Sequence, residues 1–185
     1  MTVSNWMSWE GGVDLVGSTM PDSDVPNLIV HVARIVHTPV GSAPSGMVLF
    51  QPDPQQPPLF MGFVSTNLLV GNYFAPHIFA DTPFAGAPTL EARIIIDSAH
   101  LPKSVSAHIL IPGYDIEVEF SNLGNATKIE REIGAPLPFS QQGLEVTATD
   151  VALQINGKPI DFQLLPIGIT GGAAAVWSPC GIYAR

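Results

Sequence analysis

The chain has 185 residues, which is the length of one domain, and 46% of them are hydrophobic, but only 12% are charged, about half the usual ~25%. The net charge is −9, no lysine precedes Lys103, and Arg34 and Arg93 are the only arginines before it. Nucleic-acid binding and docking on anionic membranes both need clustered Lys and Arg, so this composition excludes the first and argues against the second. The single cysteine, Cys180, excludes an intrachain disulfide and a cysteine-rich zinc site.

The N-terminal residues MTVSNWMSWEGG lack the basic and apolar regions of a secretory leader, and no stretch approaches 18 uninterrupted apolar residues. The sequence therefore predicts a cytoplasmic protein without a membrane span. Export by a route that needs no such leader is the alternative.

Strand patterns dominate the chain, whereas 17 glycines and 18 prolines leave few windows long enough for three helical turns. The first segment, LIVHVARIVH, is apolar on both parities, which is typical of a strand buried on both faces. The predicted strands, in chain order, are 28–37, 46–50, 59–70, 91–97, 104–111, 114–120 and 143–155.

Three segments of the second half give finer detail. Segment 126–134 has at most one helical turn, and the apolar parity of 143–155 switches near Ala148, which predicts a β-bulge there. Asn156-Gly157 predicts a tight hairpin turn. With no helical crossovers between the strands, the fold class is all-β, an antiparallel sandwich or barrel of about eight to ten strands with little or no helix.

The proline-rich segment QPDPQQPPLF, residues 51–60, lies between two strand patterns. The residues before it contain too few strands to fold alone, so we interpret it as a loop within one domain that spans 1–185. Residues 126–185 add further strands to the portion 1–125, including the Asn156-Gly157 hairpin.

Residues 15–120 contain a series of turn motifs: His37-Thr38-Pro39, Ser45-Gly46, Pro57-Pro58 and Gly71-Asn72-Tyr73. In this order, between apolar strands, they resemble a bacterial family known only as a domain of unknown function. The resemblance implies a β-rich fold. It implies no activity and no catalytic residue.

Few residues form a sequence pattern that is typical of a catalytic or binding site. His77 and Asp81 lie in an aromatic segment bounded by prolines and could act as an oriented general base. The other histidines are interpreted as core or turn residues, the stripe of Asp115, Glu117 and Glu119 as a solvated face, and Cys180 as buried; no metal site is predicted. Aromatic residues that could line a ligand groove are Trp6, Trp9, Tyr73 and Trp177.

Three functions fit these observations. Low charge and the lack of catalytic motifs favour a non-enzymatic β module that forms homo-oligomers or binds a partner. A small enzyme of the cyclase or isomerase type, with His77 and Asp81 in a β-barrel pocket and no cofactor, is the second hypothesis. The third is a carbohydrate-binding or toxin-like sandwich with exposed tryptophans. Enzymatic activity is left open, with a preference against it.

Overall fold

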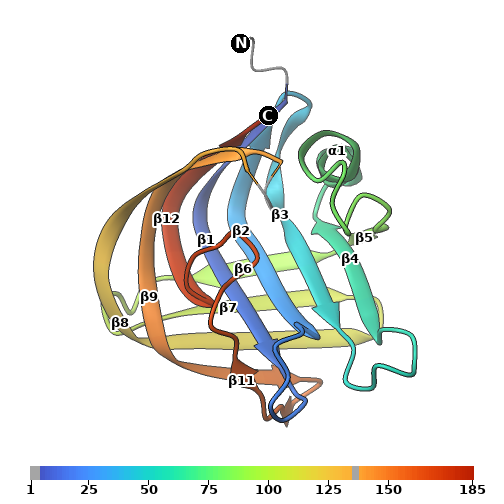
Figure 1. The fold of residues 1–185 in the computed structure, drawn as a ribbon, viewed down its shortest axis with the longest axis vertical. Helices are drawn as coiled ribbons and strands as arrows, with labels where there is room; N and C mark the ends of the chain where they lie inside the picture. The colour runs from blue at the N-terminus through green and yellow to red at the C-terminus, as the bar shows by residue number, and fades with distance from the viewer. Residues whose placement is uncertain (1–4, 135–137) are drawn as a thin grey trace.

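The structure is a computed structural model that describes residues 5–134 and 138–185, and its strands belong to one large sheet (Figure 1). Its helical part is short, a six-residue α-helix followed by a π-helical turn. The elements are β1 (Trp6–Ser18), β2 (Leu28–Thr38), β3 (Gly41–Phe50), β4 (Phe60–Ser65), α1 (Leu68–Tyr73), η1 (Phe74–Ile78), β5 (Thr89–Glu91), β6 (Arg93–Asp97), β7 (Ser104–Ile111), β8 (Tyr114–Arg131), β9 (Ser140–Ile155), β10 (Lys158–Pro159), β11 (Gln163–Leu164) and β12 (Ala175–Ala184).

The sheet has the strand order β5-β4-β3-β2-β1-β12-β9-β8-β7-β6, with β10 paired to β9 and β11 to β1. All pairs among the described strands are antiparallel except β4 and β5, which makes the sheet mixed. The two ends of the order, β5 and β6, are consecutive in the chain with Ala92 alone between them. The chain therefore passes directly from one edge of the sheet to the other, and the sheet is nearly closed into a barrel-like fold.

The long β8–β9 hairpin carries the sheet from one layer to the next. The first half of β8 pairs with β7, and β12 pairs with the first half of β9 from Val176 to Ala184. Between these regions the β8–β9 register shifts, as Leu123 faces Ala148 but Ala126 faces Val146. In Figure 1, β6, β7 and part of β8 consequently cross behind the steeper strands β1 to β4. A bulge that turns a strand from one layer into another is a known way to make such corners.

Two apolar clusters hold the fold together, one on each side of the β1–β4 layer. The inner cluster fills the barrel and includes Leu15, Val30, Phe120 and Trp177. The outer cluster lies on the opposite face, where α1, η1 and the segments near Phe139 and Leu165 cover the sheet. Because β2 contributes to both clusters, the prediction that 28–37 is buried on both faces is confirmed.

The all-β fold class is confirmed, and so are several local predictions. Asn156 and Gly157 have φ values of 52° and 70° and turn the chain between β9 and β10. The β8–β9 register does shift near Ala148, but two residues of β8 oppose the single Thr147 there, so the extra residue is on β8 and not within 143–155 as predicted. The proline-rich segment connects β3 to β4, which pair with each other, so it is a loop within one sheet.

Other local predictions are wrong. The strand predicted for 59–70 ends at Ser65, because the Asn67 side chain accepts a hydrogen bond from the Leu69 N–H (3.0 Å) and caps α1. The strand predicted for 114–120 extends to Arg131, since residues 126–131 pair with β9. Cys180 is exposed rather than buried, because a register irregularity between Trp177 and Gly181 interrupts the β12–β9 pairing around it. Within the described chain, neither helix is long and apolar enough to cross a membrane.

Candidate functional site

The candidate site lies on the outer face of β1, β2 and β12, next to a change of face in β1 at Gly11, whose φ is 64°. The register is not shifted there, since Glu10 faces Cys180 and Gly12 faces Ser178. Before Gly11 the odd-numbered Trp9 belongs to the outer cluster, and after it the odd-numbered Val13 belongs to the inner one. The irregular backbone at Gly11 therefore places Trp9 and Asp14 on the same outer face.

The Trp9 indole lies against the sheet because two glycines make room for it. A Cβ at Gly181 would be 2.2 Å from the indole atom Cζ2, and a Cβ at Gly12 would be 3.0 Å from Cδ1. Trp9 Nε1 donates a hydrogen bond of 2.9 Å to Ser178 Oγ, which in turn donates to the Leu144 carbonyl at 2.8 Å. The indole is thus a fixed wall of the site and its only donor is satisfied.

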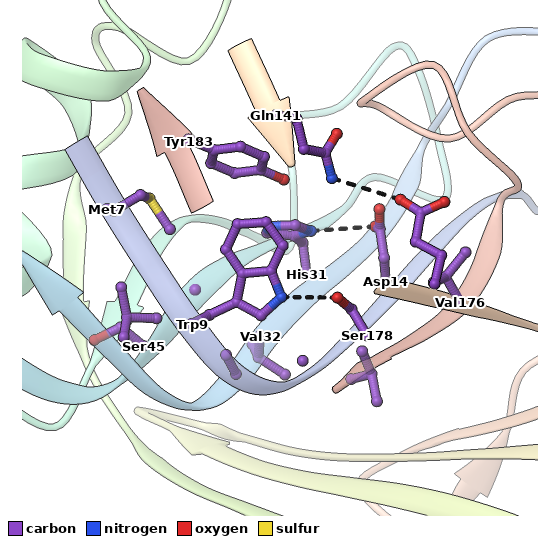
Figure 2. Close-up of a pocket in the computed structure, with 16 residues that line it drawn as sticks. Met7, Trp9, Asp14, His31, Val32, Ser45, Gln141, Val176, Ser178 and Tyr183 are labelled. Atoms are coloured by element: carbon purple, nitrogen blue, oxygen red, sulfur yellow. Dashed lines mark hydrogen bonds and ion pairs between the residues drawn. The ribbon is translucent and has the colours of Figure 1, made fainter. Parts of the chain in front are cut away.

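Three polar side chains converge beside this wall, as Figure 2 shows. Asp14 and His31 face each other across the β1–β2 pair, and His31 Nδ1 lies 3.4 Å from Asp14 Oδ1, too poorly aligned for a hydrogen bond. Tyr183 on β12 stacks on the His31 ring at a centroid distance of 6.4 Å. The buried side-chain atoms without a hydrogen-bond partner, among the described residues, are Asp14 Oδ1, His31 Nδ1 and the Tyr183 hydroxyl.

All three of these residues line one cavity of about 30 Å³. A cavity of more than about 10–15 Å³ with polar walls can hold one water molecule or one polar group of similar size. Buried polar atoms in native proteins are nearly always paired, so three unpaired atoms around one small cavity mark a place built to contact something else. The His31 side chain keeps 18% of its surface exposed, so the site reaches solvent.

An ion pair supports the site from the β8–β9 side. Arg131 donates to both carboxylate oxygens of Glu145, at 2.8 and 2.9 Å, and to Gln141 Oε1 at 2.8 Å. The hydrogen bonds to Glu145 raise the pKa of the Arg131 guanidinium above its ordinary value. Gly172 packs directly over this pair, since a Cβ there would be 2.2 Å from Arg131 Nη2. The charges of Asp14 and of the Arg131–Glu145 pair therefore act on the Tyr183 hydroxyl.

Burial raises the pKa of the Tyr183 hydroxyl well above its usual value, and the nearby charges of Asp14 and Glu145 raise it further, while Arg131 opposes them. The hydroxyl is consequently a neutral hydrogen-bond donor at physiological pH. A neutral donor beside an imidazole is a combination that general acid–base chemistry uses.

This pKa gives a stability prediction for Tyr183→Phe. The unfolded tyrosine ionises near pH 10 whereas the folded one stays protonated, so above pH 10 the folded state binds more protons and wild-type stability falls. We expect Tyr183→Phe to lose less stability between pH 10 and 11, and at pH 7 to be as stable as wild type or more stable by up to about 1 kcal/mol, because an unpaired hydroxyl is removed. Urea unfolding from pH 7 to 11 measures the stability at pH 7 and its loss between pH 10 and 11. The half-buried Tyr114→Phe is the control, and equal alkaline profiles for the two variants would show that Tyr183 is solvated.

Tyr73 and His77, two of the residues that the sequence predicted for a site, contact each other away from the polar cavity. His77 is exposed, and its ring stacks on Tyr73 at a centroid distance of 4.4 Å. The Tyr73 hydroxyl accepts a hydrogen bond of 3.3 Å from the Trp6 backbone N–H. Asp81 pairs with Arg185, and among the described contacts no hydrogen bond joins it to His77. The spacing of His77 and Asp81 thus does not produce the oriented dyad that we expected.

Trp9 and Trp177 lie on opposite faces of the sheet. Trp9 lines the cavity of the candidate site, and its role in binding stays a prediction. Trp177 is buried in the inner cluster within the barrel, away from this cavity. Of the predicted tryptophans, Trp9 is therefore the one that lines the site. The sequence analysis did not identify the polar residues of the site, which are Asp14, His31, Arg131, Glu145 and Tyr183.

A second polar cluster lies on the solvent side of β7 and β8. Potential ligand atoms of His108, Asp115 and Glu117 are within 4.8 Å of one another. His108 Nε2 and Asp115 Oδ1 are 2.6 Å apart. This hydrogen bond accounts for the close approach, and the exposed Glu117 and Glu119 agree with the interpretation of this stripe as a solvated face.

Fold and site together define a barrel-like β protein with a small polar cavity on the outer face of its sheet. Comparisons with family models, curated proteins and solved structures found no match for this chain. Its function is therefore inferred from the chemistry of its own side chains.

Proposed function

We propose that the protein is a small acid–base enzyme of the isomerase type, with His31 as the general base at the outer-face cavity. The observation that carries this proposal is the convergence of three buried, unpaired polar atoms, from Asp14, His31 and Tyr183, on one cavity. It corresponds to the enzymatic alternative of the sequence analysis, with a different base.

Asp14, His31 and Tyr183 have different roles in the proposed reaction. His31 Nε2 removes a proton from a carbon next to a carbonyl group, and the Asp14 carboxylate, 3.4 Å from Nδ1, stabilises the imidazolium that forms by its charge. The Tyr183 hydroxyl donates a hydrogen bond to the carbonyl oxygen and stabilises the enolate that forms. The C–H bond breaks as the N–H bond forms, and the electron pair moves onto the carbonyl oxygen as the enolate. Return of the proton to the same carbon exchanges it with solvent. Where a carbon–carbon double bond is conjugated with the enolate, return to the far end of that bond shifts the double bond, which is an isomerisation.

Deuterium incorporation tests this activity without knowledge of the natural substrate. The wild-type protein is incubated in D₂O with 2-butanone, and ¹H NMR follows the loss of the α-proton signals. A positioned base typically contributes about 10²–10⁴-fold, so we expect exchange at least 10² times faster than with an equal concentration of free imidazole. Exchange no faster than with imidazole, at pH values from 6 to 9, would contradict the proposal.

Self-association is a second candidate, which the exposed face of α1 favours. Leu68 and Leu69 are 45% and 62% exposed, which is unusual for two adjacent leucines in a charge-poor chain. Light scattering behind a sizing column gives the native mass, and a discrete multiple of 19.6 kDa would support a homo-oligomer. A monomer would remove this candidate. The carbohydrate-binding hypothesis has less support, because Trp9 and Trp177 are buried.

A further inference from the structure

A larger hollow lies on the same face of the sheet as the polar cavity. Its volume is about 430 Å³, and its walls are mostly apolar side chains: Ile29, Leu49, Met61, Phe79, Phe84 and Phe139. Pockets that hold small organic molecules typically have volumes of about 300–1,000 Å³ and apolar walls. We refer to this hollow as the apolar groove.

One shared strand and one ring contact relate the apolar groove to the candidate site. Ile29 and His31 are alternate residues of β2, so they lie on the same face about 7 Å apart along the strand. Phe139 lines the groove, and its ring packs on the Tyr183 ring at a centroid distance of 4.2 Å. One pair of aromatic rings therefore separates the groove from the polar cavity.

The two spaces differ in what they can accept. The polar cavity, at about 30 Å³, admits one oxygen-sized group and offers it the hydroxyl of Tyr183. The groove admits a hydrocarbon body and has few polar groups to satisfy a charged or highly hydroxylated one. A ligand that fits both has an apolar body and a single polar oxygen.

We propose that the substrates are apolar ketones whose hydrocarbon part occupies the groove while the carbonyl oxygen reaches Tyr183. This inference rests on the proposed function, since it names the substrate class of the same site. The Phe139 ring must turn away from Tyr183 when such a ligand binds. Affinity then rises with chain length, roughly fourfold for each methylene group that the groove buries.

A homologous series of methyl ketones, from 2-butanone to 2-decanone, tests the inference by titration followed with ligand-observed NMR. We expect affinity to increase along the series until the groove is full. Met61→Glu places a charge on a groove wall and should weaken 2-octanone binding at least tenfold. Ile95→Glu is the matched control, because Ile95 is similarly exposed (44% against 40% for Met61) but lies on β6 at the opposite edge of the sheet.

Affinity independent of chain length, or equal effects of Met61→Glu and Ile95→Glu, would overturn the groove assignment. Binding is measured without turnover, so the two proposals can fail separately. Chain-length-dependent binding without deuterium exchange would keep the groove and overturn the acid–base function. Exchange of 2-butanone without chain-length dependence would keep the acid–base function and overturn the groove as the substrate site.

Discussion

Replacing His31 by glutamine is expected to slow deuterium incorporation into 2-butanone by about 10²–10⁴-fold, the usual contribution of a positioned general base. Glutamine has a similar length and polarity but cannot take up a proton. The half-buried ring makes no hydrogen bond through Nδ1 that the fold would lose, so the far-UV circular dichroism and thermal midpoint should stay close to those of the wild type.

The matched control is His77→Gln, which changes the histidine that sequence analysis favoured. His77 is exposed and stacks on Tyr73, so its variant should retain the wild-type exchange rate. A folded His31→Gln variant with the wild-type rate would show that His31 is not the base.

Replacing Arg131 by methionine is expected to lower the free energy of unfolding by about 3 kcal/mol, the lower end of the range for breaking a buried ion pair. Arg131 and Glu145 are only 20% and 12% exposed, so the variant leaves the Glu145 carboxylate poorly solvated and near Asp14. The double variant Arg131→Met/Glu145→Met removes both charges and should recover most of the loss, because apolar side chains of similar volume can replace such a pair.

Urea unfolding of the wild type, both single variants and the double variant gives the coupling energy of the pair. Lys128→Met is the control for an exposed pair, since Lys128 and Glu130 are 3.7 Å apart and well solvated, and it should cost less than about 1 kcal/mol. If the double variant is as unstable as Arg131→Met alone, the loss comes from packing rather than from an unpaired charge.

The sequence predicted the fold class because its central strands have strong local signals. Segment 28–37 is apolar on both parities and forms β2, and Asn156-Gly157 forms the expected turn. Strands β1 and β12 gave no comparable signal, since Gly11 and Gly12 interrupt the first and Ser178-Pro179 the second. These two strands pair with each other in the middle of the sheet, so their regular structure depends on long-range pairing rather than on local preference.

The candidate site could not be predicted from the sequence for the same reason. Its residues come from β1, β2, β8, β9 and β12, and the hydrogen bond from Trp9 to Ser178 spans 169 positions. No spacing rule relates Asp14 to Tyr183. The one available signal was the Gly11-Gly12 pair inside an apolar segment, because glycine within a strand often marks an irregularity, but this pair alone does not show which residues change face. His77 and Asp81 are close in the sequence, but this closeness did not predict a side-chain contact, since Asp81 pairs with Arg185.

The most direct test of the acid–base site is the ¹⁵N NMR spectrum of protein labelled at its five histidines, recorded during a titration with 2-butanone. The spectra of His31→Gln and His77→Gln assign the two relevant imidazoles by the signals that disappear. The site described here predicts that the His31 nitrogens shift saturably with ketone concentration while those of His77 do not move. Saturable shifts of the His77 nitrogens, with none at His31, would contradict the His31 site and place ketone binding near Tyr73 instead.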